Sequence, residues 1–390
     1  MPHIKVKPID EKQLKIIDQL CSLVTFRADA FNGNDHLLGI SYQGEDFLLQ
    51  LKREAGTDML KYDKVTRPLK VDLIKEALAF LAEELDLEIE SSNIAHSAHR
   101  PPLSSKYFKK IKDFESIKFP FEKMAVEIGF GSGRHLLYQA KQHPDKLYVG
   151  IEIHTPSAQQ VLKQIELQGL NNIWVVNYDA RLFLEMLPSN SCEQIFVHFP
   201  VPWDKKPHRR VISSSFTDES LRVLAPGGRL ELRTDSEKYF WYSMETFFAL
   251  PKAEVTIEKN RDLAVTSKYE ARWKRQEKSI YEVHVVSWEE SAEKSLDIDF
   301  SFEEVGYFPG LETKLPAEPV IMDGYFVHFE RVYRIDSEAL LVKIAFGSFD
   351  RPEHKYILIN GNLCSYYAST PVKTAVNYQA HQKIVEFLYA

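Results

Sequence analysis

The stretch from Val126 to Gly133 reads VEIGFGSG and combines one carboxylate with three glycines at every second position. The apolar run around Glu127 predicts a buried strand, and the residues after Gly133 predict a helix. Glycines at a strand-to-helix turn let a ligand approach the backbone beside the free N–H groups of the helix. The spacing of Gly129, Gly131 and Gly133 is G-x-G-x-G, whereas a dinucleotide site requires G-x-G-x-x-G.

Glu127 indicates which ligand this turn would hold. A carboxylate two residues before the first glycine would repel a pyrophosphate, but it suits a cationic ligand. The common nucleoside cation of metabolism is S-adenosylmethionine. The stretch therefore favours S-adenosylmethionine as the cofactor, with another nucleotide or a purely structural glycine turn as the alternatives.

The middle third of the chain alternates strands and helices. The predicted strands cover Met124–Ile128, Leu147–Ile151, Ile173–Val176, Gln194–Phe199 and Arg229–Arg233. Helical segments separate them, which implies βαβ units and a doubly wound, mostly parallel α/β sheet. Ligands of such a sheet bind beyond the carboxyl ends of its strands, so polar residues at those ends are the candidates for binding.

Three further carboxylates lie at or just after these strand ends. Glu152 is placed to hold the ribose hydroxyls of the cofactor, and Asp179 is placed to accept a hydrogen bond from its adenine amino group. Asp235 follows Thr234 directly before a predicted helix. Each of the three has a structural alternative, because a carboxylate there can also cap the next helix or stay in solvent.

The sequence after the fourth predicted strand reads HFPVPWDKKPHRR. Prolines on both sides of Val201 favour an extended backbone, and Trp203 offers a flat face on which a base can stack. A basic cluster follows and contains Lys205, Lys206, His208, Arg209 and Arg210. An aromatic ring beside positive charge suits a purine on a phosphate chain; a surface loop anchored by a buried tryptophan is the alternative.

Two other basic stretches accompany this region. Residues 94–112 contain one arginine and four lysines but no acidic residue, which fits a solvated linker or a strap across a phosphate backbone. Residues 259–278 contain seven basic and three acidic residues, with Tyr269 and Trp273 among them. A charged surface helix is the alternative interpretation of that second stretch.

The sequence divides into a central sheet domain and two flanks. We expect an N-terminal α+β accessory region over 1–95, a basic linker over 96–118, the sheet domain over 119–290 and a C-terminal α+β accessory region over 291–390. Each flank contains two apolar strands, an x-Pro pair and an apolar-periodic helix. The flanks are therefore either a divergent repeat that pairs into one unit or two instances of a common pattern.

The composition limits the possible classes of protein. A net charge of −7 argues against a nucleic-acid binder that is basic all over, but it allows a local basic face. Three scattered cysteines with no C-x-x-C pair indicate neither a disulfide framework nor a zinc site, and we expect no metal. No apolar run is long enough to span a membrane, and the first residues lack the apolar core of a signal peptide. We expect a cytoplasmic protein, with a monomer as the favoured state.

Several motifs occur together over residues 122–285. They are E-I-G-F-G-x-G at Glu127–Gly133, G-I-E-I-H at Gly150–His154, Asp179-Ala180, F-P-x-P-W-x-K at Phe199–Lys205, Thr234-Asp235 and T-x-x-Y-E at Thr266–Glu270. This set resembles the motifs of the bacterial tRNA (guanine-N7)-methyltransferases of the TrmB type.

The resemblance implies a Rossmann-like, S-adenosylmethionine-dependent methyltransferase domain that methylates N7 of a variable-loop guanosine in tRNA. By this resemblance Glu127, Glu152 and Asp179 contact the cofactor. The residues it places around the target guanosine are Lys205, Asp235, Thr266, Tyr269 and Glu270.

Val201 is the clearest departure from the family pattern, which is F-P-D-P-W and has its central Asp in the active site. Guanine N7 carries a lone pair and no proton, so its methylation needs alignment of the two reactants more than it needs a general base. We expect Asp235 to position the guanine and to stabilise the positive charge that develops on it, because a nearby carboxylate is effective in a water-poor site.

Two other functions remain open at this point. One is methylation of an exocyclic amine, but such enzymes place Asn or Asp before the prolines, where this chain has His198-Phe199. The other is a non-catalytic tRNA-binding protein with a vestigial cofactor site, which Val201 makes conceivable.

Overall fold

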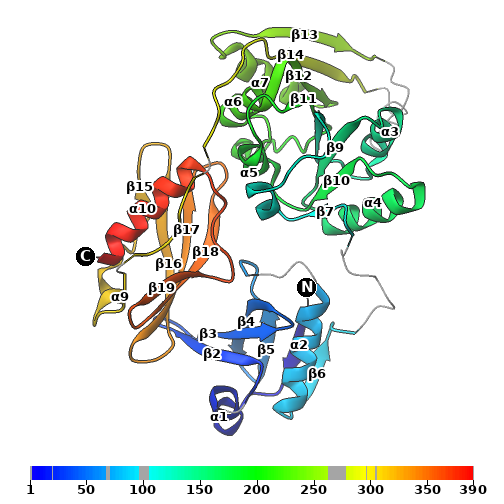
Figure 1. The fold of residues 1–390 in the computed structure, drawn as a ribbon. Helices are drawn as coiled ribbons and strands as arrows, with labels where there is room; N and C mark the ends of the chain where they lie inside the picture. Colours follow the sequence, from blue (N-terminus) through cyan, green and yellow to red (C-terminus); the bar gives the residue numbers. More distant parts are fainter. Residues whose placement is uncertain are drawn as a thin grey trace. The chain divides into compact units, whose positions relative to one another are not determined.

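The computed structural model describes residues 2–19, 21–66, 71–95, 105–261, 278–295, 297–303 and 305–389. The chain divides into two compact units (Figure 1). Unit 1 consists of Met1–Pro102, Ile298–Pro371 and Ala375–Ala390, and unit 2 consists of Leu103–Asp297 and Val372–Thr374.

Unit 2 contains a sheet with the strand order β13-β14-β12-β11-β8-β9-β10-β7. Its parallel strands are β8 (Lys123–Ile128), β9 (Lys146–Ile151), β10 (Ile173–Val176), β11 (Cys192–His198), β12 (Leu224–Thr234) and the short β7 (Phe108–Lys109). Two antiparallel strands, β14 (Tyr281–Val286) and β13 (Glu254–Lys259), complete the sheet beside β12. The chain moves outward from β8 to β10 and then returns to β11, so the strand order reverses between β8 and β11, where such sheets bind ligands.

Both faces of this sheet are covered, which explains why β8, β9 and β10 are apolar without alternation. The helices of unit 2 are α3 (Arg134–Gln142), α4 (Thr155–Gln168), α5 (Ala180–Phe183), α6 (Ser214–Val223) and α7 (Glu237–Phe248), with 3-10 turns η1 (Ile111–Glu115), η2 (Leu184–Met186) and η3 (Pro207–Arg209). Ala125 of β8 packs with α3 and α4 on one face, and Val126 packs with the other helices on the opposite face. The predicted doubly wound α/β fold is confirmed.

The predicted linker, 96–118, is described from residue 105 onward, and that part belongs to unit 2. Here β7 pairs with β10 at the edge of the sheet, and η1 follows. Ile111 and Phe114 are buried, and the ring of Phe114 lies 4.8 Å from that of Phe183. The apolar residues between the lysines therefore hold this stretch in the core, although its charge suggested a solvated segment.

Unit 1 joins the two flanks in one antiparallel sheet of eleven strands. The N-terminal strands are β1 (His3–Val6), β2 (Val24–Ala30), β3 (Asp35–Tyr42), β4 (Glu45–Glu54), β5 (Thr57–Tyr62) and β6 (Ile89–Ser92); the C-terminal strands are β15 (Val320–Ile321), β16 (Phe326–Arg334), β17 (Ala339–Gly347), β18 (Glu353–Asn360) and β19 (Leu363–Tyr367). The two sets meet where β2 pairs with β16, with Ala30 opposite Tyr333.

The helices of unit 1 pack into two apolar cores. α1 (Glu11–Gln19) and α2 (Val71–Glu84) cover the N-terminal strands, while α9 (Leu311–Lys314) and α10 (Ala375–Tyr389) cover the C-terminal strands. Each flank is thus a four-stranded meander followed by a long helix, the order of elements that the repeat hypothesis requires. Within the described parts of the chain, no helix combines the length and apolar character needed to cross a membrane.

Candidate active site

The three glycines form a left-handed turn between β8 and α3. The φ angles of Gly129, Gly131 and Gly133 are 68°, 53° and 70°, values that side chains adopt only with strain. A Cβ on Gly133 would lie 2.3 Å from Cγ2 of Val161, so α3 can approach α4 only because this residue is glycine. A Cβ on Gly129 would meet nothing within 4 Å. The backbone is therefore open on the side where a ligand would lie.

Glu152 ties this turn to the end of β9. Its carboxylate accepts hydrogen bonds from the backbone N–H of Gly131 and from that of His154, both at 2.9 Å. These bonds fix the carboxylate beside the glycine turn, as a group that holds ribose hydroxyls requires.

Glu127 is buried at the end of β8, and its carboxylate lies 2.9 Å from Nδ1 of His135 on α3. Burial by itself lowers the pKa of His135, but the charge of Glu127 and the hydrogen bond to it outweigh burial, so the pKa of His135 is raised. Protonated His135 would offset the charge of Glu127 and would weaken its attraction for a cationic ligand.

Asp179 caps α5 and pairs with a neighbour. It accepts a hydrogen bond from the backbone N–H of Arg181 at 3.0 Å, and its other oxygen lies 2.7 Å from the Arg181 guanidinium. The cap that we gave as the alternative role is therefore present. About a third of the Asp179 side chain, 37%, stays exposed and can still meet a ligand.

The loop after β11 has a strained backbone. Phe199 and Trp203 have φ angles of 52° and 45°, in the left-handed region that bulky residues avoid. The N–H of Phe199 donates to the carbonyl of Arg233 at 2.7 Å, which holds the start of the loop against β12. Such strain persists only where surrounding contacts enforce it and is concentrated at functional sites.

Arg210 supplies some of those contacts. Its Nε donates to the Pro202 carbonyl at 2.8 Å, and its guanidinium lies over the Tyr242 ring at 4.3 Å from the centroid. The residue is buried, which gives it a role in shaping the loop. By contrast, Lys205 and Arg209 are exposed, and the Arg209 guanidinium lies 5.2 Å from the centroid of the Trp203 ring.

Asp235 lies just beyond β12 with 19% of its side chain exposed. The cap of α7 is Ser236, whose hydroxyl accepts from the N–H of Tyr239, so the alternative that Asp235 is only a helix cap is wrong. Its carboxylate instead pairs with the ammonium group of Lys278 at 2.9 Å.

The remaining predicted residues divide into two groups. Thr266, Tyr269 and Glu270 lie outside the described residues. Val201 is 59% exposed in the loop, and Asp204, the carboxylate nearest to it in the sequence, is half exposed and lies 3.6 Å from the Arg210 guanidinium.

A buried charge network on β11, β12 and β14 was missed by the sequence analysis. Arg233, with no exposed surface, pairs with Glu282, while Nε2 of His198 lies 2.9 Å from a carboxylate oxygen of Glu231. Burial raises the pKa of Glu231, but the hydrogen bond and charge of His198 outweigh it and lower the pKa to about 2. The alternation of polar residues in RLELRT and YEVHVV was the available signal.

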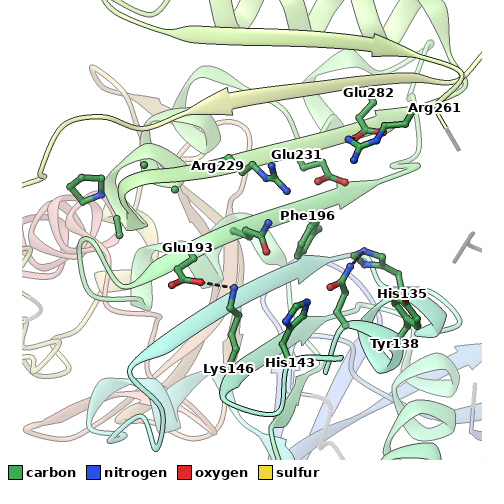
Figure 2. A pocket seen from close by; sticks show the side chains of 16 residues that line it. His135, Tyr138, His143, Lys146, Glu193, Phe196, Arg229, Glu231, Arg261 and Glu282 are labelled. Carbon is green, nitrogen blue, oxygen red and sulfur yellow. Dashed lines mark hydrogen bonds and ion pairs between the residues drawn. The ribbon is translucent and has the colours of Figure 1, made fainter. Parts of the chain in front are cut away.

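This network borders a hollow of about 780 Å³ (Figure 2). His135 and Tyr138 of α3 line one side, and Glu231 and Glu282 line the other. Ligand atoms of Glu231, Glu282 and His284 approach within 4.8 Å of one another, a spacing that would suit a metal ion. The pairing of Glu282 with Arg233 already neutralises charge there, so we treat the cluster as structural. The hollow lies apart from the glycine turn and is not the predicted cofactor site.

The strand order, the glycine turn and the carboxylates at the ends of β8 and β9 together define an S-adenosylmethionine-dependent methyltransferase with a Rossmann-like fold. A family described as "Putative methyltransferase" matches residues 122–283.

Curated relatives match nearly the whole chain. A tRNA (guanine-N(7)-)-methyltransferase of Wolinella succinogenes is 39% identical over 98% of this chain and 96% of its own. Proteins of the same name from Campylobacter jejuni and Helicobacter pylori are 38% and 41% identical, over 100% and 87% of this chain and 98% and 86% of theirs. The chain belongs to the tRNA (guanine-N(7)-)-methyltransferase family, and these relatives include both flanks.

Proposed function

We propose that this protein methylates N7 of a guanosine in tRNA, in the cytoplasm, and that the residues around the glycine turn and the Phe199–Trp203 loop carry out the reaction. The observation that carries the proposal is the position of the glycine turn with Glu127 and Glu152 at the ends of β8 and β9, next to the strained, basic loop after β11. Membership of the chain in the family supports it.

The residues of the turn fit S-adenosylmethionine. Gly129 leaves open space beside the backbone, and Glu152 is held with both oxygens oriented by N–H groups. When bound, the cofactor supplies a methyl group on a positively charged sulfur. When His135 is neutral, Glu127 contributes the negative charge that favours this cation. Glu152 holds the ribose hydroxyls, and Asp179 contacts the adenine.

On the acceptor side, the exposed Trp203 ring and the cations Lys205 and Arg209 hold the nucleotide and its backbone. Because N7 has no proton to remove, Asp235 acts by its charge, which stabilises the purine as it becomes positive. The hydrogen bond from Arg210 to the Pro202 carbonyl keeps the loop in its strained shape. Thr266, Tyr269 and Glu270 remain predicted contacts of the guanosine.

The test is to incubate the purified protein with labelled S-adenosylmethionine and bulk tRNA and to identify the product nucleoside by mass spectrometry. N7-methylguanosine is expected, and its absence would refute the proposal. Asp235→Asn should lower kcat/KM for tRNA by roughly 100-fold while cofactor affinity, measured by calorimetry, changes little. The matched control is Asp204→Asn, which removes an exposed carboxylate from the same region. Equal kcat/KM for the two variants would exclude the role of Asp235.

A further inference from the structure

Unit 1 has one sheet face that its helices leave uncovered. Leu49, Leu51 and Leu60 point into the core under α1 and α2. Because side chains alternate along a strand, Gln50 and Lys52 of β4 lie on the opposite face. The apolar cluster on that face contains Leu37, Tyr333 and Tyr356 among others, and none of its members belongs to a helix. These residues are buried because strands of the two flanks cover one another there, and the Tyr356 hydroxyl donates to Asp63. The part of the face on β4, β5 and β1 that lies outside this cluster is called the open face.

Lysines gather at the N-terminal side of this open face. The same alternation places Lys61 of β5 and Lys5 of β1 on the face of Lys52, and Lys64 lies two residues after the end of β5. The strand register puts Lys52 and Lys5 in one row, each opposite Met59. Within the described ranges, no ion pair joins any of these four lysines to an acidic residue.

The lysines are also close enough to repel one another. The pKa of Lys61 is lowered, first by burial and then by the charges of Lys52 and Lys64. Cross-strand neighbours of like charge destabilise a sheet, so this arrangement costs folding free energy. An anion bound over the ammonium groups of Lys52, Lys61 and Lys64 would offset this cost.

The charges next to this open face are neutralised internally. A hollow of about 280 Å³ is lined by β3 and β4 of the N-terminal flank and by β16, β17 and β18 of the C-terminal flank, and Lys52 forms part of its wall. The other cations of the wall have partners: Arg331 pairs with Asp35, and Lys343 lies 2.9 Å from Glu330. Asp35, although opposite Lys52 in register, is thus engaged elsewhere. The uncompensated charge is confined to β4, β5 and β1.

We propose that the lysine row formed by Lys5, Lys52, Lys61 and Lys64 is a second tRNA-binding surface, carried by unit 1, that holds the phosphate backbone of the substrate. The inference rests on the proposed function, because that function supplies the polyanion. A nucleic-acid backbone fits better than a small anion, because the lysines extend over three adjacent strands instead of converging in an enclosed site.

The expected size of the effect follows from counterion release. For each phosphate contact on a duplex, the affinity for nucleic acid varies with salt concentration to about the −0.9 power. At ~0.15 M salt, each contact therefore raises the affinity about fivefold relative to its value at ~1 M salt. Loss of two contacts should therefore weaken tRNA binding by at least ~10-fold and reduce the slope of log Kd against log salt by about 1.8.

The experiment compares two double variants of the full chain. Lys52→Gln/Lys61→Gln removes two charges from the open face. Lys12→Gln/Lys15→Gln removes two exposed charges from α1, which packs on the covered face. For each variant, the KM and Kd for tRNA are measured at several salt concentrations, together with kcat at saturating tRNA and the affinity for S-adenosylmethionine.

The open-face variant should show the weakened binding and the smaller salt slope, with kcat and cofactor affinity unchanged, and the α1 variant should match the wild type. If both variants behave alike, or if the open-face variant loses only retention on heparin while its KM for tRNA stays at the wild-type value, the surface is not a tRNA site. Failure of the proposed function would look different: the wild-type protein would then form no N7-methylguanosine, while its binding of tRNA would still report on the lysines.

Discussion

Replacing Gly133 by alanine tests why the glycine turn needs glycine at its last position. Two costs add at this residue. A left-handed φ costs a side chain about 1–2 kcal/mol, and forcing a methyl group into a packed contact costs about 1–3 kcal/mol. The contact arises because the added Cβ would lie 2.3 Å from Cγ2 of Val161. Gly133→Ala should therefore destabilise the packing of α3 on α4 by about 2–5 kcal/mol.

The two costs can be separated with the chain's own residues. Gly129 has nearly the same φ, 68°, but an added Cβ there meets nothing within 4 Å, so Gly129→Ala should cost only the strain of about 1–2 kcal/mol. Val161→Ala removes the atoms that clash with an alanine at 133. The double variant Gly133→Ala/Val161→Ala should thus be more stable than the sum of its single changes by about 1–3 kcal/mol.

Native-state hydrogen exchange of the α3 and α4 amides, without cofactor, measures these local free energies directly. The same cycle built on Gly129→Ala should give a coupling near zero. If Gly129→Ala and Gly133→Ala cost the same and neither couples to Val161→Ala, then the contact with α4 is not the reason for glycine at 133.

Three further predictions follow from buried groups of unit 2. The pKa of His135 is raised above its ordinary value of about 6.5. The wild type should therefore be more stable than His135→Gln below pH ~6.5 and should lose this advantage as the pH rises through the raised pKa. Hydrogen exchange of the α3 amides measures the difference, and a difference that stays constant across pH would contradict this prediction. Arg233→Met should lower stability by up to about 3–5 kcal/mol, because it removes the fully buried cation beside Glu282 and leaves this carboxylate with His284 and the half-exposed Arg261. Adding Glu282→Gln should restore much of the loss in thermal unfolding. Arg210→Lys should lower kcat on tRNA by about 10-fold or more with cofactor affinity unchanged, because lysine cannot reproduce the flat guanidinium over Tyr242. An unchanged kcat would show that Arg210 does not hold the loop in its reactive shape.

Local patterns were sufficient to predict where Glu127 and Glu152 lie relative to the glycine turn. Glu127 and Glu152 end apolar strands, and parallel strands bring their carboxyl ends to one edge, so their proximity to the glycine turn follows from topology. The role of Asp235 was harder to predict. Thr234, Asp235 and Ser236 are all residue types that can cap a helix, and only the geometry identifies Ser236 as the cap.

Other features depend on contacts that no local pattern encodes. The pairing of β2 with β16 joins residues some 300 positions apart in the chain, from Ala30 to Tyr333. The network of Arg233 and Glu282 was missed because the strands were identified from their apolar residues, and the alternating polar ones were not assigned a face. The prediction of a linker over 96–118 gave weight to the lysines and neglected Ile111 and Phe114, whose side chains are buried.

The seam between β2 and β16 also has a consequence for synthesis on the ribosome. In the sequence, Leu103–Asp297 of unit 2 separates the first segment of unit 1 from its later segments, so β2 is made long before its partner β16. At ~5–20 residues per second, the 303 residues from Ala30 to Tyr333 take roughly 15–60 s to translate. During that interval the nascent chain carries an unpaired strand edge, which favours association between chains on neighbouring ribosomes. Slow elongation, which prolongs this state, or dense loading of ribosomes on the message, which crowds it, should therefore reduce the yield of native protein more than the stability of the finished fold would suggest.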